Sequence, residues 1–164
     1  MKLYLLRHAT AELRGPTTPD RNRRLTNQGL EELREVVKAL EKLKVAPDEV
    51  FASPYRRAWD TAVIAGRELR PGRKPTELSA LMPAGNVNRL WTELKKYHAA
   101  KSVMMVGHEP LLSEFAAFLL NSPHLTINLK KSGVIRIDLH TVQIARPFGT
   151  LRWVLTAAQL RRMA

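Results

Sequence analysis

Short apolar runs alternate with longer amphipathic segments along this chain, and this alternation strongly limits the folds open to it. The runs at 2–7, 48–52 and 102–107 have the length of buried strands. The segment 30–43 instead places leucine and valine at helical spacings of three and four residues. Strands that alternate with helices favour right-handed crossovers and a mainly parallel sheet. We therefore expect an α/β three-layer sandwich, with a mainly parallel central sheet and helices on both faces.

Further elements follow from the same reading of the sequence. A short strand is predicted at 76–78, and an antiparallel pair of strands at one edge over 133–139 and 150–155. Further helices are predicted from Ser53 towards Leu69 (with Ser53 as the N-cap), over 87–98, over 110–120, and at the end of the chain around Arg161 and Arg162. No internal repeat or linker interrupts the pattern, so one domain over residues 1–164 is expected.

Composition limits the chemistry. None of the 164 residues is a cysteine, which excludes disulfides, thiolate metal sites and cysteine nucleophiles. The first apolar run is too short for a signal peptide or a membrane span, so no membrane contact and a cytoplasmic location are expected. A net charge of +12 indicates an anionic partner. The basic residues form only short groups without a nucleic-acid-binding motif, so we expect no dedicated nucleic-acid binding.

Residues suited to a phosphate group follow three of the predicted strands. The first strand ends in Arg7 and His8, the second leads into a helix whose first turn holds Arg56 and Arg57, and the third ends before His108. Each feature alone is more often structural than functional. In parallel sheets, however, ligands bind beyond the carboxyl ends of the strands. The repetition at one edge therefore predicts a phosphoryl site.

The residue types also suit phosphoryl transfer. Guanidinium groups bind phosphate oxygens in a bidentate manner, and nearby arginines lower the pKa of a histidine, which keeps its imidazole neutral. A neutral histidine can attack phosphorus, and a second one can stabilise the charge on the phosphoryl oxygens. The histidines lack carboxylates at metal-ligand spacing, and no P-loop motif is present. No metal and no cofactor are expected.

Four sequence motifs resemble the histidine phosphatase superfamily, also called phosphoglycerate mutase-like. "RHA" at 7–9 is similar to the family's Arg-His-Gly, and "SPYRRAWDTA" at 53–62 resembles its Ser-Pro-x-x-Arg-Ala-x-x-Thr. "VGHEP" at 106–110 resembles the segment that carries the second histidine. "RRLTNQG" at 23–29 is similar to a stretch in the short branch typified by the SixA phosphohistidine phosphatases.

The resemblance implies a role for each matching residue. His8 would be the nucleophile that becomes phosphorylated, while Arg7, Arg57 and His108 would hold the phosphoryl group. Arg23 would contribute to the rim of the phosphate site. The chain departs from the family pattern in two places. Position 9 is an alanine where the family has glycine, and the chain lacks an insertion that carries an acidic proton donor in larger members.

The proton donor therefore stays unassigned. Glu77 is the nearest carboxylate by position, and Glu109 and Glu12 are no better supported.

The missing insertion predicts a shallow, open pocket, which suits a phosphate carried on a protein surface. The expected function is a metal-independent phosphatase that acts through a phosphohistidine intermediate on phosphohistidine proteins, for instance a histidine phosphotransfer domain. An imidazole leaving group also demands less of a general acid than an alkoxide does. Two alternatives remain open: a phosphatase of a small phosphorylated metabolite, and a basic module that binds phosphate or nucleic acid without chemistry.

Overall fold

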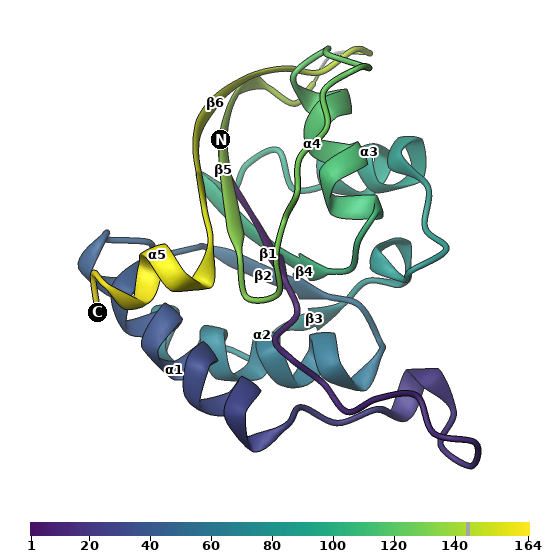
Figure 1. Ribbon diagram of the computed structural model, residues 1–164. Helices are drawn as coiled ribbons and strands as arrows, with labels where there is room; N and C mark the ends of the chain where they lie inside the picture. The colour runs from purple at the N-terminus through teal and green to yellow at the C-terminus, as the bar shows by residue number, and fades with distance from the viewer. Residues whose placement is uncertain (144) are drawn as a thin grey trace.

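A mixed sheet of six strands lies at the centre of the computed structural model, which describes residues 1–143 and 145–164 (Figure 1). The strand order is β3-β2-β4-β1-β5-β6. Neighbouring strands from β3 to β1 pair in parallel, whereas β5 pairs antiparallel with both β1 and β6. The strands are β1 (Lys2–Arg7), β2 (Glu49–Ala52), β3 (Thr76–Glu77), β4 (Ser102–Gly107), β5 (Val134–Thr141) and β6 (Phe148–Leu155).

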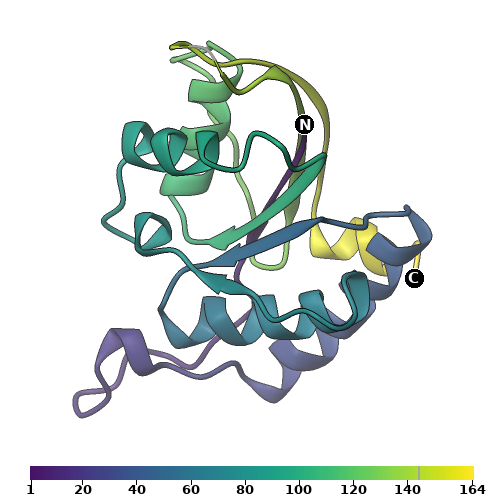
Figure 2. The same cartoon turned by 180° about the vertical axis from the view of Figure 1, so that it is seen from behind.

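Helices cover both faces of this sheet, as Figures 1 and 2 show from opposite sides. One face carries α1 (Asn27–Lys42), α2 (Arg56–Leu69) and α5 (Ala157–Arg161). The other face carries α3 (Val87–Lys95) and α4 (Leu111–Leu119). Two short 3-10 helices, η1 (Asp20–Asn22) and η2 (Ser79–Leu81), lie in the connections. The predicted three-layer α/β sandwich, with its antiparallel pair at one edge, is confirmed.

Burial on both faces explains the uninterrupted apolar runs. In β1, Tyr4 and Leu6 belong to the core beneath α1 and α2, while Leu3 and Leu5 belong to the core beneath α3 and α4. Because successive side chains of a strand point to opposite faces, a strand covered on both sides must be apolar throughout. Within the described residues, none of the helices has both the length and the apolar character that a membrane span needs.

Two helix ends differ from the prediction. The helix predicted with Ser53 as its N-cap begins instead at Arg56. The buried Ser53 hydroxyl contacts His108, the residue after β4, and the chain stays extended at Tyr55. The helix predicted over 87–98 ends at Lys95, where tighter turns place the Tyr97 ring 4.4 Å from that of Phe51. The other predicted elements are present close to their predicted bounds.

The segment that follows β1 is fastened to the start of α1. The Thr10 carbonyl accepts a hydrogen bond from the Thr26 backbone N–H at 3.0 Å, and Ala11 bridges to Leu25. Gly29 lies directly against this segment, since a Cβ atom there would lie 2.2 Å from the Thr10 carbonyl oxygen. The close approach holds the backbone that leads away from His8.

Gly29→Ala is therefore expected to lower the free energy of unfolding by about 1–3 kcal/mol, because the added methyl group overlaps backbone atoms. Gly66→Ala is the matched control. Its Cβ would meet only Pro75, at 3.6 Å, so better helix propensity should leave the protein as stable or about 0.5–1 kcal/mol more stable. Urea unfolding measures both variants, and equal stability of the two would contradict the expectation.

Candidate active site

The pairing of β1 with β4 brings the two predicted histidines together. Arg7 pairs with Gly107 in the parallel register, and the His8 backbone N–H donates to the Gly107 carbonyl at 3.1 Å. The rings of His8 and His108 follow directly, with their centroids 5.1 Å apart. Both side chains are nearly fully buried, with 7% of His8 and 2% of His108 exposed.

The hydrogen bonds of His8 fix which ring nitrogen carries the proton. Nδ1 lies 2.8 Å from the Ala9 carbonyl oxygen, which can only accept, so Nδ1 carries the hydrogen. Nε2 therefore keeps its lone pair, which accepts a hydrogen bond from Arg57 Nε at 3.2 Å. Ala9 causes no strain here, because its φ angle is not positive and its backbone N–H donates to Thr61 Oγ1 at 3.1 Å.

The first turn of α2 separates two neighbouring arginines. Arg57 points into the protein, with 4% of its surface exposed, and its guanidinium lies 5.0 Å from the centre of the Tyr55 ring. Arg56 points outward and forms an ion pair with Asp60 at 3.4 Å. The structure thus brings Arg57 to His8 and leaves Arg56 at the surface.

Ser53 orients the second histidine, a contact that the sequence analysis missed. Its Oγ lies 2.9 Å from His108 Nε2 and accepts a hydrogen bond from the Tyr55 backbone N–H at 3.3 Å. If the Ser53 hydroxyl donates to Nε2, that nitrogen is the acceptor of the neutral ring, and the single N–H hydrogen of His108 lies on Nδ1. That Nδ1 is buried and has no hydrogen-bond partner within the described part of the chain.

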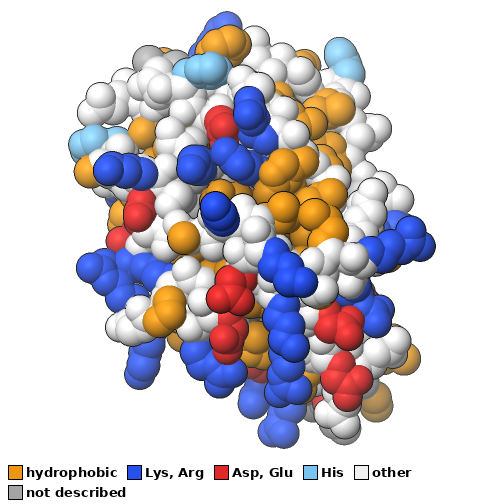
Figure 3. All heavy atoms as spheres, turned by 90° about the vertical axis from the view of Figure 1, so that its left-hand side faces the viewer, with side chains coloured by type: hydrophobic (Ala, Val, Ile, Leu, Met, Phe, Trp, Pro, Cys, Tyr) orange, Lys and Arg blue, Asp and Glu red, His pale blue; other side chains and the backbone are white. Residues whose placement is uncertain are grey.

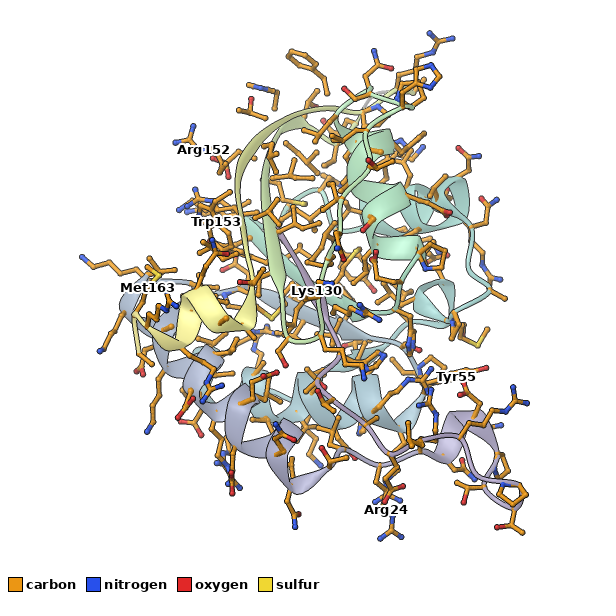
Figure 4. The ribbon with its side chains drawn as sticks, in the orientation of Figure 1. Arg24, Tyr55, Lys130, Arg152, Trp153 and Met163 are labelled. Atoms are coloured by element: carbon orange, nitrogen blue, oxygen red, sulfur yellow. The ribbon has the colours of Figure 1, made fainter. Side chains whose placement is uncertain are left out.

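The loop before β5 forms the side of the site next to Arg7. Arg7 donates to the Leu129 carbonyl at 2.7 Å, and the Ser132 backbone N–H lies 3.4 Å from the His8 carbonyl. Arg7 Nε and Ser132 Oγ are buried without partners among the residues that the structure describes. Figure 4 shows Lys130 of this loop on the side of the sheet where β1 ends. No sequence motif pointed to this loop.

Arg23 does not reach either histidine directly. It binds the Asp20 carboxylate through Nε at 2.9 Å and the Glu12 carbonyl through Nη1 at 2.8 Å. The same Asp20 carboxylate contacts Arg57 Nη2 at 3.2 Å. Asp20, which sequence reasoning missed, therefore links the two arginines. The only sequence signal is that an acidic residue opens the basic stretch 20–24.

The three glutamates considered as proton donors form no hydrogen bond with either histidine. Glu109 accepts hydrogen bonds from the backbone and the hydroxyl of Ser113 at the start of α4. Glu12 accepts from the Arg24 backbone N–H at 3.2 Å, and Glu77 is exposed on β3. The structure therefore assigns the proton donor to none of them.

Burial is the main reason why both imidazoles are neutral. It lowers the pKa of His8 from its ordinary 6.5 to about 3, against the contact with the Ala9 carbonyl and with further lowering by Arg57 and Arg7. Burial, with His8 and Arg57 as smaller causes, lowers the pKa of His108 to about 2. The sequence correctly predicts that the histidine pKa is lowered. Nearby arginines are the predicted cause, whereas desolvation by burial is the larger one.

Two side chains border the site, and the shallow, open pocket stays a prediction. Tyr55 packs edge-on against His108 with ring centroids 5.3 Å apart, and Asp20 lies against Arg57.

Positive charge is not confined to this site. On the face with β6 and α5, Lys and Arg side chains are spread out with acidic and apolar side chains between them (Figure 3).

Comparison with known proteins places this geometry in a family. The model of the histidine phosphatase superfamily (branch 1) matches residues 3–82. The chain is 30% identical to the phosphohistidine phosphatase SixA of Escherichia coli over 121 residues, which cover 73% of this chain and 74% of that protein. The chain belongs to the histidine phosphatase superfamily.

A second relative and a solved structure extend the match over nearly the whole chain. An uncharacterised protein of Picosynechococcus is 33% identical over 94% of this chain and 99% of its own length. The solved structure of the protein histidine phosphatase SixA complexed with tungstate superimposes with a TM-score of 0.84, at 26% identity, and covers 98% of this chain and 99% of that one.

Neither His8 nor His108 is expected to titrate between pH 5 and 8, because their pKa values are about 3 and about 2. Nitrogen NMR of the imidazoles measures this, and His8 should show its hydrogen on Nδ1. Below about pH 6.5 the unfolded chain binds protons that the folded chain does not. Unfolding free energy should therefore fall by roughly 1–2 kcal/mol per histidine by pH 5. A His8 signal that shifts with a midpoint near 6.5 would contradict the expectation.

Proposed function

We propose that this chain is one histidine phosphatase domain over residues 1–164 that hydrolyses phosphohistidine on proteins through a phosphorylated His8. Family membership and the SixA-like structure support a phosphatase. The observation that carries the proposal is the tautomer of His8, whose unprotonated Nε2 faces Arg57 while Nδ1–H is held by the Ala9 carbonyl. A nucleophilic histidine needs this free lone pair.

In the first step the Nε2 lone pair of His8 attacks phosphorus, and the bond between phosphorus and the leaving group breaks with its electron pair. His8 becomes a phosphoimidazolium whose Nδ1–H stays on the Ala9 carbonyl. We assign Arg7, Arg57 and the Nδ1–H of His108 as the donors to the phosphoryl oxygens. Fixed donors of this kind stabilise the transition state because they need no reorganisation during the reaction. Arg23 contributes at the rim through Asp20.

In the second step a water molecule attacks the same phosphorus atom, and the bond to His8 Nε2 breaks. The water proton passes to the departing phosphate, and His8 returns as the neutral Nδ1–H tautomer. Neither step needs a metal ion or another cofactor. Within the described residues, no group of three or more His, Asp or Glu side chains gathers in a way that could hold a metal.

A phosphohistidine substrate fits a site whose nearby carboxylate, Asp20, stays charged because Arg57 and Arg23 outweigh the effect of burial and hold its pKa below the ordinary value. If the far ring nitrogen of the substrate imidazole is protonated, the ring leaves as a neutral molecule and takes no proton from the enzyme. An alkoxide leaving group would need a general acid, and the hydrogen bonds of Glu12 and Glu109 and the exposure of Glu77 assign that role to none of the three. SixA, with which the chain shares 30% identity, is a phosphohistidine phosphatase. The cytoplasmic location and a histidine phosphotransfer domain as partner stay predictions.

The test is phosphate release from a phosphorylated histidine phosphotransfer domain in the presence of EDTA. Wild type should release phosphate and His8→Ala should lose at least about 10³-fold in rate, because the covalent route is gone. His98→Ala is the matched control, since the exposed His98 also places Nδ1 near a backbone carbonyl, that of Lys95, at 3.3 Å. This control should keep full activity.

Other results distinguish the alternatives. Turnover of one small phosphoester that depends on His8, with kcat/KM on the order of 10⁴ M⁻¹s⁻¹ or more and no action on the phosphoprotein, would identify a metabolite phosphatase. Binding of a polyanion with steep salt dependence that survives His8→Ala, without any turnover, would identify a binding module. Full activity of His8→Ala would refute the covalent mechanism.

A further inference from the structure

The guanidinium of Arg57 presents two different edges to two different neighbours. The edge formed by Nη1 and Nη2 faces Asp20, with Nη1 2.9 Å from the Asp20 carbonyl and Nη2 3.2 Å from its carboxylate. The edge formed by Nε and Nη2 faces His8, with Nε 3.2 Å from the His8 Nε2 atom. A guanidinium can bind a phosphate with either edge. Here one edge is fixed by protein and the other points to the nucleophile.

Asp20 is itself held in place from two sides. Its carbonyl accepts from the Arg23 backbone N–H at 3.4 Å, and its carboxylate binds the Arg23 side chain at 2.8 Å. Partial burial raises the pKa of Asp20, but Arg57 and Arg23 outweigh it and hold that pKa below its ordinary value of 3.8. The carboxylate therefore stays charged at neutral pH and bridges the two arginines.

We propose that Asp20 is a positioning residue for phosphoryl transfer: it fixes Arg57 so that the Nε–Nη2 edge meets the phosphoryl group at His8. This inference rests on the proposed function. The sequence alone gives Arg57 no fixed orientation, because a long side chain in the first turn of a helix has several rotamers. Anchoring by Asp20 selects one of them before substrate arrives, and misplacement by about 1 Å can cost on the order of 10²-fold in rate.

A carboxylate beside a phosphate-binding arginine could instead compete with the substrate for the same guanidinium. The geometry disfavours competition because the Asp20 main-chain carbonyl shares the contact, at 2.9 Å from Nη1. A competing carboxylate could swing away by side-chain rotation, but a carbonyl held by the η1 turn cannot. The two roles predict opposite effects on phosphate affinity, which makes them separable by experiment.

The experiment uses wild type, Asp20→Asn and Asp20→Ala. It measures the binding of inorganic phosphate by calorimetry, and kcat and KM with the phosphorylated histidine phosphotransfer domain as substrate. Asp20→Ala should bind phosphate about 10-fold more weakly and lose about 10- to 100-fold in kcat. Asp20→Asn should lie between, because the amide oxygen still accepts from Nη2 without the charge. In an Arg57→Ala background, Asp20→Ala should cause no further loss, since the residue acts through Arg57.

Asp60→Asn is the matched control, because Asp60 pairs with the neighbouring Arg56, which points away from His8. It should bind and turn over like wild type. Tighter phosphate binding by Asp20→Ala would refute the proposal in favour of competition. Unchanged binding and kcat in both Asp20 variants, or a full additional loss in the Arg57→Ala background, would also refute it. If the wild type binds phosphate in an Asp20-dependent manner but shows no turnover, the proposed function is refuted. A role of Asp20 in phosphoryl transfer then falls with it, and only its role in placing Arg57 for phosphate binding stands.

Discussion

The parallel pairing of β1 with β4 is the constraint on which the site depends. Arg7 and Gly107 pair in register, so the residue after each strand, His8 and His108, arrives at the same level of the sheet. Both strands are buried on both faces, and a slip by one residue would move every side chain to the opposite core. The packing of apolar residues far from the chemistry therefore sets the 5.1 Å distance between the two rings.

The elements and the residues that follow them could be predicted because their signals are local. Apolar runs of strand length, leucines at helical spacing and the motifs around His8, Arg57 and His108 all lie within a few neighbouring residues. Parallel topology then directs the three strand ends to one edge. The choice between Arg56 and Arg57 followed from the motif resemblance, and the structure buries Arg57 and leaves Arg56 at the surface.

The contacts that orient these groups could not be predicted, because each joins residues far apart in sequence. Ser53 meets His108 across 55 positions, and Asp20 meets Arg57 across 37. Ser53 before a proline fits an ordinary helix cap equally well, and the pattern does not distinguish a cap from a histidine partner. Asp20 is followed by three arginines, at positions 21, 23 and 24, and the sequence would allow an ion pair with any of them. Only the path of the backbone decides which partner is within reach.

One buried environment has opposite consequences for the two kinds of base at this site. Desolvation lowers the pKa of His8 and His108 from 6.5 to about 3 and about 2, so both rings are neutral at physiological pH. It also lowers the pKa of Arg57, but from an ordinary 12.5 and against the opposing effect of Asp20, so the guanidinium stays charged. Burial therefore keeps the His8 ring neutral although Arg57, a permanent cation, lies 3.2 Å away. The proposed attack by His8 then needs no separate base to deprotonate the ring.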